Sequence, residues 1–202
     1  SDNKFNTTFS NFEVLEIDAG TGAVTIDTRK FNNVSQVNVA ATLTANSTIN
    51  NLAEGGTVKL TAAQAGRDLT VKIFDASVST TNVLNLEISN AAAAAGAGIN
   101  VGTVTAAGVE TININSDLTA PTAASTTHTL ILTAADATSI VVTGDAGIDL
   151  STTTAAKVTN FDASAVTAGA VTFTSTNITA GEAVTIKGGA GNDALIGTSQ
   201  AN

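Results

Sequence analysis

The amino-acid sequence predicts an all-β fold and, within that class, a parallel β-solenoid similar to a β-helix or β-roll. First, apolar and polar residues alternate with a period of two along much of the chain. Second, the chain repeats its own phrases, which is typical of stacked repeat architectures. Third, aromatic residues make up only 3%, so the core is expected to be thin layers of Val, Ile, Leu and Ala. An antiparallel β-sandwich, which shows similar alternation, is the alternative.

The expected strands begin with residues 22–28, where Val24 and Ile26 face one side and Thr25 and Asp27 face the other. Six later segments alternate in the same way, at Val58/Leu60, Leu69/Val71/Ile73, Leu84/Leu86/Ile88, Ile112/Ile114, Val171/Phe173 and Val184/Ile186. Clusters of Gly, Asn, Asp, Ser and Thr between them predict turns. The alanine run 91–95 is too short for a stable helix alone, and predicts a loop or tight corner, with one helical turn as the alternative.

Internal repeats link distant parts of the chain. Residues 22–28 reappear as 169–175 and 182–188, residues 71–77 reappear as 158–164, and residues 12–18 reappear as 109–115. Their spacing is irregular, so the sequence defines no single period. Residues 118–127 contain the only proline and predict a long surface loop, with a linker as the alternative. We therefore expect a Thr/Ala-rich β-repeat domain over residues 1–187 and a separate glycine-rich segment over residues 188–202.

Charge and composition exclude several classes of partner. The chain has 17 acidic and 8 basic residues, for a net charge of −9. It contains no basic stripe, so nucleic acid and anionic membrane surfaces are not expected partners. It has no run of about 18 apolar residues, so we expect no membrane insertion. Cysteine is absent, which excludes thiolate metal sites, whereas carboxylates and carbonyls favour hard cations such as calcium.

The glycine-rich segment carries the clearest chemical motif. Residues 188–196 read Gly-Gly-Ala-Gly-Asn-Asp-Ala-Leu-Ile, which resembles the calcium-binding nonapeptide of repeats-in-toxin proteins. Glycines permit a tight turn with inward carbonyls, an aspartate supplies a charged oxygen, and Leu195 starts a short strand into the core. We expect calcium at Gly189, Gly191 and Asp193, with a metal-free glycine-rich hairpin loop as the alternative. Residues 197–202 look like a degenerate second turn, with Asn202 where an aspartate would be expected.

Three further phrases, residues 109–116, 142–151 and 160–165, resemble the repeat regions of bacterial S-layer and other large proteins of the repeats-in-toxin type. The resemblance covers nearly the whole chain. It implies secretion to the cell surface by a type I system, calcium-dependent folding and self-association into a lattice. Cell-surface polysaccharide would be contacted through regions outside this segment. Asp145, Asp149 and Asp162 lie in these phrases as additional candidate ligands, and the alternative for each of them is an Asx-turn in which the carboxylate bonds its own backbone.

Catalytic constellations are not evident in the sequence. His128 is the single histidine, no cysteine is present, and no Gly-x-Ser-x-Gly elbow occurs. We predict that His128 is exposed at the surface and that the chain is not an enzyme. The expected function is a structural, calcium-dependent segment of a secreted surface-layer lattice. The alternatives are an adhesin or binding module, or a non-catalytic spacer of a secreted enzyme or toxin.

Overall fold

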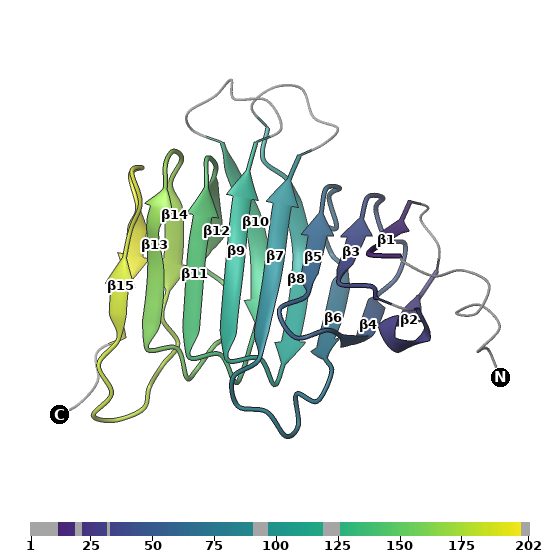
Figure 1. The fold of residues 1–202 in the computed structure, drawn as a ribbon. Coiled ribbons are helices and arrows are strands. Elements are labelled where there is room, and N and C mark those ends of the chain that lie inside the picture. The colour runs from purple at the N-terminus through teal and green to yellow at the C-terminus, as the bar shows by residue number, and fades with distance from the viewer. Residues whose placement is uncertain (1–11, 19–21, 32, 91–96, 119–125, 199–202) are drawn as a thin grey trace.

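The computed structural model describes residues 12–18, 22–31, 33–90, 97–118 and 126–198. These residues form sixteen β-strands and one short 3-10 helix, η1 (Thr28–Lys30). The strands make two eight-stranded sheets, one containing the odd-numbered strands and the other the even-numbered strands. Figure 1 shows the strands standing side by side in chain order, from purple at the N-terminal end to yellow at the C-terminal end.

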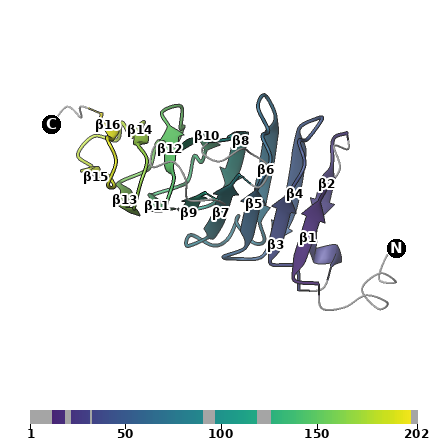
Figure 2. The ribbon, with the colours of Figure 1, turned by 90° about the horizontal axis from the view of Figure 1, so that it is seen from above.

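Sheet A contains β1 (Val14–Ile17), β3 (Gln36–Val39), β5 (Thr57–Leu60), β7 (Val83–Ser89), β9 (Thr111–Asp117), β11 (Ser139–Gly144), β13 (Asn160–Val166) and β15 (Thr185–Lys187). Sheet B contains β2 (Thr25–Asp27), β4 (Ser47–Leu52), β6 (Asp68–Ile73), β8 (Asn100–Ala107), β10 (Thr127–Thr133), β12 (Gly147–Leu150), β14 (Val171–Thr174) and β16 (Ala194–Ile196). Each coil of the chain adds one strand to each sheet, and the view from above shows the two rows of strands facing each other (Figure 2).

The molecule is therefore a two-sheet parallel β-solenoid, which confirms the predicted fold class. Each strand pairs in parallel with the strand two positions away in the chain, as in β1 with β3 and β7 with β9. An antiparallel sandwich would instead pair strands that run in opposite directions. Residues 188–198 continue the same stack, because β16 pairs with β14.

Coil length varies along the stack, which explains the irregular repeat spacing of the sequence. Asn38 and Glu16, which meet on neighbouring coils, are separated by 22 positions in the sequence. Asn113 and Asn85, which meet in the same way, are separated by 28 positions. In the coil that contains β13, Asn160 and Ser139 are 21 apart. The strands keep their alignment while the turns absorb the difference in length, so no single period could describe the sequence.

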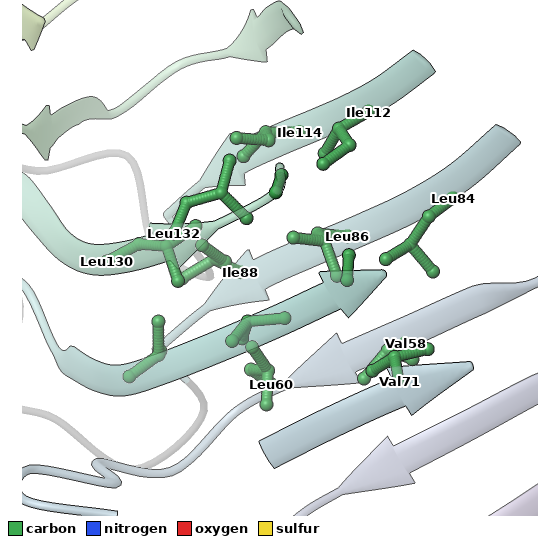
Figure 3. Close-up of a cluster of buried hydrophobic side chains, with 14 of the residues drawn as sticks. Val58, Leu60, Val71, Leu84, Leu86, Ile88, Ile112, Ile114, Leu130 and Leu132 are labelled. Carbon is green, nitrogen blue, oxygen red and sulfur yellow. The ribbon is translucent and has the colours of Figure 1, made fainter. Parts of the chain in front are cut away.

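The core lies between the sheets and is built from the inward-facing residue of each alternating pair. Figure 3 shows Leu84, Leu86 and Ile88 of β7 beside Ile112 and Ile114 of β9 in this layer, and all five side chains are buried. Nearer the C-terminal end, two aromatic rings fill the space between the sheets. Phe161 of β13 and Phe173 of β14 stack with their ring centroids 4.0 Å apart.

Burial decreases toward the two ends of the stack. Leu15 and Ile26 in the first coil, and Ile186 and Leu195 in the last, are only partly buried, because each has a neighbouring coil on only one side within the described part of the chain. No helix among the described residues is long and apolar enough to cross a membrane. The alanine run 91–95, most of the 118–127 segment and Asn202 lie outside the described residues.

Candidate metal-binding turns

The glycine-rich motif forms one of a series of stacked turns. We call this edge the upper rim: it is where strands of sheet A end and those of sheet B begin, uppermost in Figure 1. Asp145 lies in the turn between β11 and β12, and Asp193 lies in the turn between β15 and β16. The intervening turn, residues 167–170, contains no acidic residue. Asp145 and Asp193 are therefore two coils apart, about 10 Å at the usual strand spacing, which is too far to share one calcium ion.

Asp193 is bonded to the preceding coil. The Val171 N–H group donates a hydrogen bond to Asp193 Oδ1 at 2.8 Å. Asp145 does the same two coils earlier, since the Leu118 N–H group donates to Asp145 Oδ1 at 2.7 Å. The Asp145 N–H group in turn donates to Asp117 Oδ1 at 3.3 Å. These bonds join successive coils and differ from the local Asx-turn considered for Asp145.

Carboxylates elsewhere in the stack satisfy backbone N–H groups in the same way. Glu54 Oε1 accepts from Val83 N–H at 2.8 Å, and Glu110 Oε2 accepts from Asn82 N–H at 2.8 Å. Asp136 Oδ2 accepts from Gly108 N–H at 3.1 Å. These N–H groups lie where the coils turn. Sequence reasoning missed Glu54, Glu110 and Asp136, because each carboxylate and its partner are more than 25 residues apart.

Gly189 and Gly191 are placed where the backbones of two coils touch. A Cβ atom on Gly191 would overlap the carbonyl oxygen of Gly169, and one on Gly189 would lie 2.8 Å from Val166 O. Neither glycine adopts a positive φ. Glycine is therefore required here by close packing between turns rather than by a left-handed backbone conformation.

Asp162 and Asp149 lie on strands of opposite sheets, away from the upper-rim turns. Asp162 of β13 accepts from Lys187 Nζ at 2.8 Å and from Ser164 N–H at 3.0 Å. The bond from the Lys187 ammonium, helped by Ser164, lowers the pKa of Asp162 to about 2. Asp149 of β12 accepts from Ser151 N–H at 2.9 Å, two residues along the chain. These two aspartates do not converge with each other or with Asp193.

The structure thus brings together only part of the expected ligand set. Gly189, Gly191 and Asp193 share one turn, whereas Asp145, Asp149 and Asp162 lie elsewhere. Within the described ranges, no group of three His, Cys, Asp or Glu residues is arranged to hold a metal. Calcium takes about six to eight oxygen ligands. The turn at Asp193 can therefore supply part of a calcium shell, and the described residues do not complete it.

The prediction that His128 is exposed is wrong, because its side chain is fully buried. It lies on β10, where it shares the inward face with Leu130 and Leu132, which are also buried. Its Nδ1 accepts a hydrogen bond from Ile99 N–H at 3.0 Å. Its Nε2 lies 3.0 Å from the carbonyl oxygen of Asp117. The alternation of polar and apolar residues in Thr127–Thr133 is the sequence pattern that places His128 on the same inward face as Leu130 and Leu132.

Comparison with known proteins adds no family or relative to these observations. No protein-family model matches the chain, and no curated protein matches it either.

Proposed function

We propose that this chain is a structural, non-catalytic segment of a secreted bacterial surface-layer lattice, in which calcium strengthens contacts at the upper rim. The proposal depends chiefly on one observation: carboxylates in the turns are used to join coils. Asp193, Asp145 and Glu110 each accept a backbone N–H bond from a neighbouring coil. A rod built in this way is suited to a load-bearing array, because each coil is tied to the next through backbone, core and turn.

Other ionisable groups also form contacts between neighbouring coils. Asp162 is paired with Lys187 at 2.8 Å, and Asp136 is paired with Lys157 at 2.8 Å. Both pairs connect neighbouring coils. These ion pairs support the proposal because they hold successive coils together, which a structural segment requires.

Calcium enters the proposal at the β15–β16 turn. Asp193 Oδ1 is engaged by Val171 N–H, so Oδ2 and the carbonyls of Gly189 and Gly191 are the proposed ligands. The rest of the shell would come from another glycine-rich coil or from a neighbouring copy. An ion there would offset part of the net charge of −9. Extracellular calcium modules commonly bind at about 10⁻⁴–10⁻³ M.

Two substitutions at Asp193 separate the hydrogen-bonding role from the calcium role. Asp193→Asn keeps an oxygen for Val171 N–H but removes the charge, whereas Asp193→Ala removes both. We expect millimolar calcium to raise the melting temperature of the unmodified chain more than magnesium does. The Asn variant should lose this response while keeping most of its stability in chelator. An equal calcium response in the Asn variant would contradict ligation by Asp193.

Assembly is tested separately by sedimentation velocity and electron microscopy of the same proteins. We expect calcium to convert the unmodified chain to larger ordered assemblies and to have little effect on Asp193→Asn. Glu110→Gln is the matched control, because it also changes a carboxylate that accepts a neighbouring N–H group but lies outside the glycine-rich turn. A chain that stays monomeric across the calcium range would count against the lattice role.

A further inference from the structure

The buried histidine is a feature that the proposed lattice function does not use. His128 lies on β10 in sheet B, and its ring lies between the two sheets near the upper rim. Ile99, which donates to Nδ1, directly precedes β8 of sheet B. Asp117, whose carbonyl contacts Nε2, is the last residue of β9 in sheet A. The ring therefore ties an N-terminal strand end of sheet B to a C-terminal strand end of sheet A.

Both contacts require one protonation state of the ring. Because Ile99 N–H is a donor, Nδ1 must be unprotonated to accept its bond. The ring proton then lies on Nε2, which donates to the Asp117 carbonyl. A second proton would fall on Nδ1 and point at the Ile99 N–H group. The bond would be replaced by two opposed donors, and a cation would be buried beside Leu130 and Leu132.

The charged groups around the ring act against this effect but do not cancel it. Burial lowers the pKa of His128, and it outweighs the hydrogen bond to the Asp117 carbonyl and the charges of Asp117 on β9 and Asp145 in the β11–β12 turn, all of which favour the protonated ring. β8 contains no charged residue. Asp149 of the neighbouring strand β12 lies on the opposite side of its strand from the buried Ile148 and Leu150.

We propose that His128 is an acid-sensitive pin between the two sheets, and that its protonation loosens the junction of β8, β9 and β10. The group is neutral in both states of the protein well above pH 6.5, its ordinary pKa. As the pH falls below that value the unfolded chain takes up the proton first, so stability is lost between pH 6.5 and the lower pKa of the folded state. The paired carboxylates do not contribute in this window, because the pKa values of Asp162 and Asp136 lie below 3.8.

The melting temperature of the full chain, measured as a function of pH at a fixed calcium concentration, tests whether protonation of His128 destabilises the fold. His128→Gln removes the titrating group but retains an amide donor and an oxygen acceptor. We expect the unmodified chain to melt at a lower temperature at pH 5 than at pH 7. The Gln variant should show a much flatter profile over the same range, even if its melting temperature is lower throughout. Parallel profiles for the two proteins would overturn the proposal.

Two site-resolved measurements keep the test valid if the variant folds poorly. Nuclear magnetic resonance titration of the unmodified chain should give a pKa below 6.5 for its single histidine, and a value at or above 6.5 would overturn the proposal. Amide exchange, corrected for its intrinsic pH dependence, should accelerate at Ile99 on acidification. The Leu43 amide is the control, because its acceptor is the non-titrating Gln64 Oε1 at 2.6 Å. Equal protection of Ile99 at pH 7 and pH 5 would exclude release of the pin.

Discussion

Side chains on the outward face of sheet A meet their counterparts on the next coil. Lys59 lies 3.3 Å from Glu87, and Asn113 Nδ2 donates to Asn85 Oδ1 at 2.9 Å. Such bonds are individually weak because water competes with them. Their residue types nevertheless match from coil to coil, with acid beside base and amide beside amide. This matching favours one alignment of neighbouring strands over a shifted one.

The ion pair of Asp162 and Lys187 should contribute to stability in an acid-dependent way. The pKa of Asp162 is lowered from 3.8 to about 2. The ion pair therefore stabilises the folded state fully above pH 3.8, and this stabilisation is lost as the pH falls toward 2. We expect Asp162→Asn to lower the free energy of unfolding at pH 7 by no more than about 1 kcal/mol, since the pair is partly exposed.

Urea unfolding of Asp162→Asn, Lys187→Gln and the double variant measures this contribution. The two single effects should be less than additive at pH 7, and most of the coupling should be lost near pH 2. Asp149→Asn is the control, since Asp149 Oδ1 accepts a bond from Ser151 N–H rather than from a lysine. A coupling that persists unchanged at pH 2 would show that the ion pair is not its source.

Turns in this solenoid are packed backbone against backbone, so their small residues have a structural cause that is separate from metal binding. Gly191 faces the carbonyl oxygen of Gly169 on the preceding coil. Gly147 faces the backbone of Ala170 on the next coil, at the same upper rim. A methyl group at either position would force two coils apart, and the displacement would extend into the strands that follow.

Gly191→Ala should therefore destabilise the last coil even without calcium. Overpacking of this kind typically costs about 1–3 kcal/mol, and the obstacle here is backbone that cannot rotate away. Gly197→Ala is a matched control in the same region, because its Cβ would meet only Ile186 Cδ1, at 3.9 Å. Exchange rates in β16 measured in chelator should rise for Gly191→Ala and stay nearly unchanged for Gly197→Ala. Equal rates in the two variants would contradict the packing explanation.

Strands with strong aliphatic alternation were predictable from sequence. The expected segments at Leu84/Leu86/Ile88 and Ile112/Ile114 are β7 and β9, and the one at 22–28 contains β2, which is shorter. β8 was not identified, because Gly102 interrupts its alternation and Thr and Ala fill half of its positions. β10 alternates clearly, with His128, Leu130 and Leu132 on its inward face, but it was not among the expected strands.

Contacts between coils were not predictable from one sequence. The bond between Asp193 and Val171 spans 22 residues, and that between Glu54 and Val83 spans 29. Nothing local indicates such a partner when coil length varies. The glycine-rich nonapeptide correctly placed Gly189, Gly191 and Asp193 in one turn, because that proximity is local. It could not show that Asp145 lies two coils away, since this depends on how the chain is stacked.

The whole molecule is a one-dimensional stack in which each coil contacts mainly its two neighbours. Central strands such as β7 and β9 have paired strands on both sides, and their inward residues are buried. β15 and β16 each pair with a strand on one side only in the described structure. Stability in such an array is approximately a sum of coil and interface contributions. The last coil should therefore open at a lower free energy than the centre.

Two truncations test this gradient. Leu86 in β7 is 1% exposed, so Leu86→Ala should cost about 2–5 kcal/mol and lower the melting temperature of the whole stack. Leu195 in β16 is only partly buried, and Leu195→Ala should cost less and act locally. Hydrogen exchange followed by mass spectrometry should show faster exchange in β15 and β16 for Leu195→Ala, with β7 and β9 unchanged. Leu86→Ala should accelerate exchange in coils on both sides of β7. A uniform acceleration along the chain in Leu195→Ala would instead show that all coils open as one cooperative unit, and the additive description of the stack would fail.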